Sequence, residues 1–285
     1  MSAGLPRVLT DDLVRAALQE DLGRAGDVTT TAIARPGQPA SGDLVAREAG
    51  VVAGLDLAIR AFELLDPALA ASGTRPDGTR VAPGDVLAHV SGAARALLGA
   101  ERVALNLCSH LSGVATATAE LVEAVRGTSC RITCTRKTTP GLRAVEKAAV
   151  RAGGGSNHRF GLDDAVLVKD NHVLLAGGVR EAVRRVRESA GHLLPIAVEV
   201  DTLAELRELL ADPVDVVLLD NMDPATLREA VALVDGRMTT EASGRITAET
   251  APAIAAAGVE VISAGWLTHS APILDIGLDL HLPSA

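Results

Sequence analysis

The sequence of 285 residues is poor in aromatic side chains, with two Phe, one Trp and no Tyr. Its hydrophobic core must therefore be built mainly from Ala, Val and Leu, since hydrophobic residues still make up 48% of the chain. Proteins that bind single-stranded nucleic acid stack bases on aromatic rings, so this use of the surface is disfavoured. A formal net charge of −9 also disfavours a general binder of polyanions.

Cysteine is scarce as well, and Cys108, Cys130 and Cys134 form neither a disulfide framework nor a zinc-ligand pattern. We expect buried, reduced thiols at these positions. The start of the chain lacks the apolar core of a secretory signal, and no stretch of about 18 apolar residues could span a membrane. These absences predict a cytoplasmic protein without a membrane or nucleic-acid partner.

Positive charge is concentrated in one short part of this acidic chain. Between residues 126 and 159 the only acid is Glu146, and the cations are Arg126, Arg131, Arg136, Lys137, Arg143, Lys147, Arg151 and Arg159. Such a local excess predicts a focused anion-binding site. Arg136 and Lys137 precede a Pro-Gly break, and Arg159 follows three consecutive Gly, so we assign these three residues to that site. The cations between 143 and 151 have helical spacing and could equally form one solvated helix face.

From residue 131 onward, short apolar runs alternate with helical patterns. The runs predict six strands, at 131–134, 165–168, 196–200, 215–219, 237–240 and 259–263. Between them, Thr202 and Glu205 have the spacing of a capping box, and Asp223 with Pro224 is typical of a helix start. This alternation predicts a parallel sheet with helical crossovers.

Polar residues follow the carboxyl end of each predicted strand. They are Thr135–Lys137, Lys169–His172, Glu199, Asp201, Asp220, Asn221, Glu241–Gly244, Ala264 and Gly265. In a β/α barrel these ends meet around one mouth, whereas an open doubly wound sheet would spread them along a crevice. We expect the barrel, with the small residues of the last two loops lying close to a bound anion.

The first part of the chain has a different pattern. A helix is predicted at 11–23, Gly-bounded strands at 42–54 and 81–92, and a long helical segment at 93–127 with a break near Ser112 and Gly113. We therefore expect an α/β protein with an N-terminal α+β, sandwich-like domain at 1–112 and a C-terminal parallel β/α barrel at 113–268. The apolar tail, 269–285, is expected to pack back on the first domain.

Eight segments together resemble the quinolinate phosphoribosyltransferase family, over nearly the whole chain. They are EDLGRAGDVTT, ERVALNLCSHLSGVAT, TRKTTPGLR, AVRAGGGSNHRFGLDDAVLVKDNH, VEVD, LLDNM, EASGRI and ISAGWLTHS. The resemblance implies a pentosyl-transferring glycosyltransferase that converts quinolinate and PRPP to nicotinate mononucleotide, pyrophosphate and CO2 in de novo NAD biosynthesis. It also implies Mg2+, an open-sided barrel, and a homodimer in which the small domain of one subunit covers the barrel mouth of the other.

The resemblance also implies a role for each candidate site residue. The residues implied for the quinolinate carboxylates are Arg102, Thr135, Arg136, Lys137, His158, Arg159 and Lys169. Those implied for PRPP and Mg2+ are Lys137, Lys169, Glu199 and Asp220. Those implied for the 5′-phosphate are Ser243, Gly244, Ser263, Ala264, Gly265 and His269. Arg102, on the long helix of the first domain, would come from the partner subunit. The chemistry agrees, because Arg matches carboxylates in a planar fork, Lys acts as a point charge on phosphate, and carboxylates bind Mg2+.

Three residues depart from the family pattern. Cys134 stands where many members have Asp, Arg245 where a second Gly often follows Ser-Gly, and Trp266 where a smaller residue is usual. The last two flank the expected phosphate loops, so the shape of those loops is an open question for the structure.

Other functions stay open on the residues alone. Lys169 or Lys137 could form a Schiff base in a barrel lyase, although that chemistry needs one desolvated lysine without a cluster of Arg around it. Further alternatives are a relative of the same fold, either a phosphoribosyltransferase acting on another pyridine or a metal-transport-linked paralogue, and a non-catalytic binder of phosphorylated metabolites. Glu199 and Asp220 near the cations favour metal-dependent turnover. The three Gly at 153–155 do not belong to a P-loop and predict a flexible turn before His158.

Overall fold

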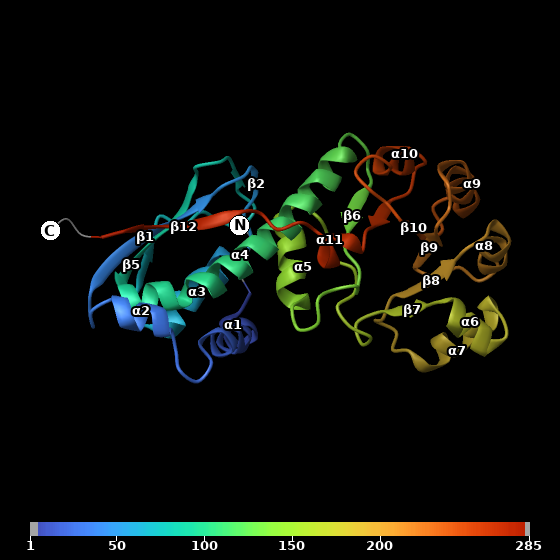
Figure 1. The fold of residues 1–285 in the computed structure, drawn as a ribbon. Coiled ribbons are helices and arrows are strands. Elements are labelled where there is room, and N and C mark those ends of the chain that lie inside the picture. The colour runs from blue at the N-terminus through green and yellow to red at the C-terminus, as the bar shows by residue number, and fades with distance from the viewer. Residues whose placement is uncertain (1–4, 283–285) are drawn as a thin grey trace. The chain divides into compact units, whose positions relative to one another are not determined.

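The computed structural model describes residues 5–282 (Figure 1), and the chain divides into two units. Among the described residues, unit 1 comprises 5–119, 139–154 and 270–282, and unit 2 comprises 120–138 and 155–269. Each unit thus combines segments that are distant in sequence. The domain bounds at 112 and 268 stay a prediction. No helix among the described residues is long and apolar enough to cross a membrane.

Unit 1 is built on an antiparallel sheet with the strand order β12–β1–β5–β3. Its strands are β1 (Pro39–Ala46), β3 (Ala70–Ser72), β5 (Val86–Ala93) and β12 (Ile276–His281), and β2 (Gly50–Val51) pairs separately with β4 (Arg80–Val81). Its helices are α1 (Arg7–Leu22), α2 (Val28–Ile33), α3 (Leu55–Leu65), most of α4 (Ala94–Ala124) and α5 (Arg143–Ala152). The C-terminal strand β12 pairs with β1 from Ser41 to Ala46. This confirms the predicted α+β fold for the N-terminal part.

Helix α4 runs unbroken from Ala94 to Ala124, so the predicted break near Ser112 and Gly113 is wrong. These small residues serve close packing instead. Ser112 Oγ accepts the Ala53 N–H at 3.0 Å and lies 3.2 Å from Ala53 O. A Cβ at Gly113 would lie 2.0 Å from Pro272 O and 2.9 Å from Ile273 Cα. Glycine is needed there because the tail backbone crosses the helix at this point.

Gly113→Ala should lower the free energy of unfolding by about 3 kcal/mol, because the added methyl group meets backbone atoms that no rotamer change can move. Gly99→Ala, in the same helix, is the matched control. Its Cβ would lie 3.1 Å from Leu65 Cδ2, the flexible end of a side chain, and the better helix propensity of Ala would gain about 1 kcal/mol. Urea denaturation of both variants checks this. Equal losses at the two positions would contradict the close approach.

Unit 2 contains a six-stranded parallel sheet with the order β6–β11–β10–β9–β8–β7. The strands are β6 (Arg131–Thr133), β7 (Val166–Val168), β8 (Ile196–Val200), β9 (Val216–Asp220), β10 (Thr239–Ser243) and β11 (Val261–Ser263). The helices are α6 (Asp170–Ala176), α7 (Val179–Ser189), α8 (Leu203–Leu209), α9 (Pro224–Val234), α10 (Ala251–Ala255) and α11 (Trp266–His269). Since β6 and β7 are the two edges of this described sheet (Figure 1), the predicted open-sided β/α barrel is confirmed.

Local signals account for most of these bounds. The Thr202 and Glu205 capping box and the Asp223 N-cap before Pro224 are confirmed. The strand predicted at 237–240 is displaced, because β10 starts at Thr239, where the N–H of that residue bonds to Asp215 O. Helix α6 has no predicted counterpart: it begins directly after β7, where the sequence indicated only a polar strand end.

The buried groups of the chain include three thiols and part of the basic helix α5. The three Cys side chains are buried and form no disulfide among the described residues, as predicted. Lys147 and Glu146 are fully buried, so a single solvated face is the wrong interpretation of the cations at 143–151. Glu146 lies 2.9 Å from His110 Nε2 and accepts the Thr139 N–H at 3.1 Å. These bonds fix the segment that leads into α5.

Candidate active site

The strand register of unit 2 places the candidate residues in two layers at the carboxyl ends of the sheet. One row aligns Glu199, Leu218, Glu241 and Val261, and the row two residues further on aligns Asp220, Ser243, Ser263 and Thr133. Residues two apart on a strand face the same side, so both rows share one face. The row between them, which includes Val200, Leu219 and Ile262, is apolar and buried. Polar groups from several strands therefore gather on the face opposite this apolar layer.

Two guanidinium groups converge beside β6. Arg136 lies in the loop after β6, and Arg159 follows Ser156, which bridges to Thr133. Burial lowers the pKa of Arg159, and the nearby charge of Arg136 lowers it further. Arg159 Nη1 donates to Ala165 O at 2.9 Å, yet the Nε atoms of Arg136 and Arg159 are buried without a hydrogen-bond partner. Two mutually repelling cations with unused donors form a site prepared for an anion.

His158 lies between this pair and the interior of the barrel. Its Nδ1 accepts the backbone N–H of Arg159 at 2.8 Å, and its Nε2 lies 3.7 Å from Glu241 Oε1. Burial raises the pKa of Glu241; the hydrogen bond from Ser263 opposes this and the charge of Glu199 adds to it. In the sequence, Glu241 is only part of a polar strand end, and it is not among the predicted site residues. The only sequence signal for a role of Glu241 in the site was its place two residues before Ser243, on the same face of the strand.

The loops after β6 and β11 meet around Gly265. A Cβ at this position would lie 2.9 Å from Lys137 Cδ, 3.3 Å from Thr135 Oγ1 and 3.6 Å from His269 Nε2. Thr135 Oγ1 accepts the Lys137 N–H at 3.0 Å, and Thr268 Oγ1 donates to Lys137 O at 2.8 Å. Four of the predicted site residues, Thr135, Lys137, Gly265 and His269, are thus brought together.

Two residues assigned to the phosphate use their polar groups elsewhere. The Ala264 N–H donates to Thr133 O at 3.0 Å and prolongs the strand ladder, so it is not available for the phosphate contact expected of it. The Ser263 side chain is buried: its hydroxyl lies 3.5 Å from Ala242 O and hydrogen-bonds to the Glu241 carboxyl. Ser263 therefore faces the interior layer of the barrel. The sequence could not indicate either bond, because both depend on which strands are neighbours.

The end of β10 lies close to the end of β9. Gly244 has φ +143°, and a Cβ there would lie 2.9 Å from Asn221 Oδ1. Asn221 adopts a left-handed backbone conformation, φ 52°, in which Asn is one of the few residues commonly found. Its N–H donates to Ser243 O at 2.9 Å, and its Nδ2 donates to Asp220 Oδ2 at 2.5 Å. Asn221, which is not among the predicted site residues, therefore orients Asp220.

The ends of β7 and β8 carry an ion pair between Lys169 and Glu199. The Lys169 N–H donates to His172 Nδ1 at 2.9 Å, which helps to start α6 and fixes the backbone of the lysine. Burial raises the pKa of the neighbouring Asp201, and the charges of Glu205 and Asp220 raise it further. Negative potential is thus concentrated beside Lys169, at the ends of β8 and β9.

Two of these carboxylates have the chemistry of magnesium ligands. Among the described residues, no group of three or more His, Cys, Asp and Glu side chains could hold a metal ion. Mg2+ is commonly held by one or two carboxylates together with waters and substrate phosphates, so such a group is not required. Glu199 and Asp220 could provide the carboxylates, since Asn221 occupies only one Asp220 oxygen, Oδ2.

The three departures from the family pattern have clear local roles or positions. Cys134 is buried and its Sγ donates to Asn157 Oδ1 at 3.4 Å, which ties β6 to the segment before His158. Trp266 Nε1 donates to Ile246 O at 2.8 Å and links the loops after β11 and β10. Arg245 is exposed. The indole of Trp266 therefore holds the two expected phosphate loops together.

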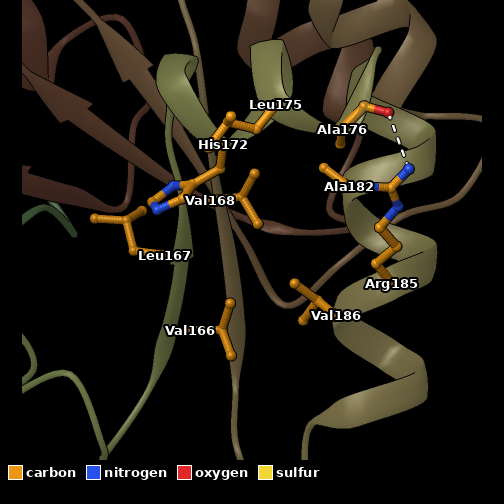
Figure 2. A pocket seen from close by; sticks show the side chains of 9 residues that line it. All are labelled: Val166, Leu167, Val168, His172, Leu175, Ala176, Ala182, Arg185 and Val186. Carbon is orange, nitrogen blue, oxygen red and sulfur yellow. Dashed lines mark hydrogen bonds between the residues drawn. The ribbon is translucent and has the colours of Figure 1, made fainter.

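Two further features are Arg102 and a cavity in unit 2. Arg102 is exposed on α4 in unit 1, and its assignment to the site stays a prediction. A cavity of about 310 Å3 in unit 2 is formed by β7, α6 and α7, and Figure 2 shows its mainly apolar lining, with Arg185 turned to Ala176 O. His172 lines this cavity, but none of the candidate anion-binding residues does, so the cavity is separate from the guanidinium pair.

Comparison with known proteins adds independent information. A family model described as quinolinate phosphoribosyl transferase, C-terminal domain, matches residues 114–279, and the N-terminal domain model matches residues 27–112. A probable nicotinate-nucleotide pyrophosphorylase (carboxylating) of Bacillus subtilis is 45% identical over 263 residues, covering 92% of this chain and 90% of that protein. The Mycobacterium leprae nicotinate-nucleotide pyrophosphorylase (carboxylating) is 47% identical over 277 residues, covering 94% and 96%.

The fold comparison agrees with these matches. The crystal structure of NadC from Streptococcus pyogenes superposes with a TM-score of 0.95 at 40% identity, covering 99% of this chain and 100% of that one. Sequence and fold thus match over almost the full length of both chains. The chain belongs to the quinolinate phosphoribosyl transferase family.

Proposed function

We propose that this protein transfers the phosphoribosyl group of PRPP to quinolinate, forming nicotinate mononucleotide, pyrophosphate and CO2 for NAD biosynthesis. The observation that carries the proposal is the convergence of Arg136 and Arg159, whose buried Nε atoms have no partner. Quinolinate has two adjacent carboxylates on a planar ring, and guanidinium groups bind carboxylates as planar forks. Membership of the family supports the same reaction.

The protein supplies orientation and preorganised charge for this reaction. Arg136 and Arg159 hold the carboxylates of the acceptor, while Lys137 and Lys169 face the departing pyrophosphate. As the C1–oxygen bond breaks, positive charge develops on the ribose and the pyridine nitrogen attacks C1. The ring nitrogen is then cationic, and it stabilises the carbanion that is left at C2 when the C2–carboxylate bond breaks and CO2 leaves. A proton from solvent replaces it at C2.

The 5′-phosphate of PRPP is assigned to the loops after β10 and β11. Gly265 lets the side chains of Lys137 and His269 lie close to the loop backbone, and Gly244 adopts a conformation that favours glycine. Ser243, next to Gly244, adds a hydroxyl at the same strand end. Ala264 and Ser263 support these loops through their bonds to Thr133 O and Ala242 O.

Magnesium is part of the proposal. Glu199 and Asp220 would hold it, with Asn221 fixing the second carboxylate. When bound, the ion neutralises charge on the departing pyrophosphate.

A cytoplasmic homodimer completes the proposal. Arg102 of a second copy would bind a quinolinate carboxylate, which fits its exposed position on α4 in this chain. Residues contributed by a partner in this way make each site depend on both subunits.

The test is an assay with quinolinate and PRPP, with and without Mg2+, that follows CO2 and pyrophosphate together. We expect equal amounts of the two products with Mg2+ and almost none after chelation by EDTA. Nicotinate, which lacks the second carboxylate, should give no CO2 and is the control acceptor. Turnover with another pyridine but none with quinolinate would contradict the proposal.

The lyase alternative is weakened because Schiff-base chemistry needs one desolvated lysine, whereas Lys169 is partly exposed and forms an ion pair with Glu199. Borohydride reduction in the presence of a carbonyl compound should therefore leave the protein mass unchanged. A stable adduct on Lys169 or Lys137 would favour the lyase.

A further inference from the structure

Glu241 is a buried carboxyl group of unit 2 that the proposed reaction does not use. It lies on β10 in the same row as Glu199, one layer below Ser243, and only 6% of the residue is exposed. A carboxyl group at this depth is costly unless its oxygens are bonded. Ser263 donates to the group, but Oε1 has no hydrogen-bond partner. Such a residue is a poor choice for packing alone, which points to a role in the site above it.

The group that faces this oxygen is the imidazole of His158. Nε2 lies 3.7 Å from Glu241 Oε1, which is longer than a hydrogen bond but close enough for one to form with a small rotation. On the other side of the ring, Nδ1 accepts the Arg159 N–H at 2.8 Å. A neutral imidazole that accepts at Nδ1 carries its proton at Nε2. The proton of His158 therefore points to Glu241.

These contacts connect the interior of the barrel to the guanidinium pair. Ser263 bonds to Glu241, Glu241 faces His158, and His158 bonds to the backbone of Arg159. The orientation of the His158 ring thus helps to fix the backbone of Arg159, from which the guanidinium side chain extends. The Arg159 side chain donates further along to Ala165 O, while its buried Nε has no hydrogen-bond partner.

We infer that Glu241 is a positioning residue for the quinolinate site: it holds His158 by its Nε2 side, so that the imidazole in turn anchors the backbone of Arg159. The inference rests on the proposed function. It gives His158 a neutral, orienting role, in which the positive charge for the carboxylates comes from Arg136 and Arg159. Glu241 itself touches no substrate.

The test uses three variants of the full-length protein. Glu241→Met keeps the volume of the side chain and removes the carboxyl group; Glu241→Gln keeps an oxygen that can accept from Nε2–H. Glu229→Gln is the control, because Glu229 pairs with Arg207 on the surface. We expect Glu241→Met to raise the KM for quinolinate by about tenfold or more, with the KM for PRPP changed by less than about threefold. Glu241→Gln should restore the quinolinate KM to within about threefold of wild type.

A second readout is independent of turnover. Protein labelled with 15N-histidine reports the tautomer of His158, assigned by loss of its signals in His158→Gln. We expect a protonated Nε2 in the wild type and in Glu241→Gln, and a mixture of tautomers in Glu241→Met. An unchanged tautomer and an unchanged quinolinate KM in Glu241→Met would overturn the inference, as would equal increases in both KM values.

If Glu241→Met does not fold, Glu241→Gln decides. The wild-type tautomer and KM in that variant support the inference, and a changed tautomer overturns it. If the wild type does not react with quinolinate at all, the proposed function fails, and the tautomer measurement still decides whether Glu241 controls His158.

Discussion

Arg136→Ala should lower kcat/KM for quinolinate by about 10²- to 10³-fold, the loss expected when one partner of a buried charge-assisted pair is removed. Arg136 is one of two guanidinium groups whose Nε donors are buried without a partner. Both donors would be used only when the acceptor carboxylates are bound. Removal of Arg136 leaves one carboxylate without its counterion, and the effect should fall on quinolinate rather than on PRPP. Steady-state kinetics with each substrate varied in turn measures this.

The same substitution should not destabilise the protein without ligand. Arg136 contributes repulsion to Arg159, whose pKa is already lowered by burial and by that neighbouring charge. The melting temperature of the variant should therefore equal or exceed that of the wild type, because functional sites often hold groups that lower the stability of the protein without ligand. Arg131→Ala, at the exposed start of β6, is the matched control from the same basic region. If Arg131→Ala lost as much activity, a diffuse positive field and not a defined pair would explain the binding.

Strand positions, helix caps and the polar strand ends were predictable because they depend on residues near each other in sequence. Thr202 and Glu205 form their capping box whatever the rest of the fold does. The parallel order then brings the ends of neighbouring strands together, so Lys169 and Glu199 could be assigned to one site before their pairing was known. Alternation of strands with helices was sufficient for this part of the prediction.

What the sequence could not indicate depends on partners distant in the chain. Gly113 resembles a helix break, but it is a point where the tail backbone passes over α4. Lys147 has the spacing of an exposed face and is nevertheless fully buried. The Ala264 N–H could be assigned to a phosphate only as long as its bond to Thr133 O was unknown. In each case a tertiary contact determines the role of the residue, and local spacing carries no information about that contact.

The candidate site holds polar groups in arrangements that are unfavourable without substrate. The Nε atoms of Arg136 and Arg159 and one oxygen of Glu241 are the buried side-chain nitrogen and oxygen atoms without a partner in the described part of the chain. All three belong to unit 2 and surround His158 or the loop after β6. A stable core does not require such groups, so their concentration in one place is a physical argument for function that is independent of the family match.

Mixing two inactive variants should restore activity if Arg102 acts across a homodimer. Arg102→Ala and Lys169→Ala should each lower turnover by about 10²-fold or more, since each removes a charge from the proposed site. In a heterodimer, one site combines the native Arg102 of one chain with the native Lys169 of the other. Random pairing of equal amounts makes half of the dimers mixed, with one working site each, so about a quarter of wild-type activity should return. The measurement is the quinolinate assay after subunit exchange.

The matched control mixes Arg136→Ala with Lys169→Ala. Arg136 and Lys169 both lie in unit 2 of the same chain, so every site in that heterodimer lacks one of them and activity should stay low. Heterodimers have to be demonstrated directly, by native mass spectrometry of chains with different tags. Recovery in both mixtures would show exchange artefacts or incomplete inactivation. Recovery in neither, with mixed dimers present, would remove Arg102 from the partner's site, while the Arg136 and Arg159 pair would stand on its own geometry.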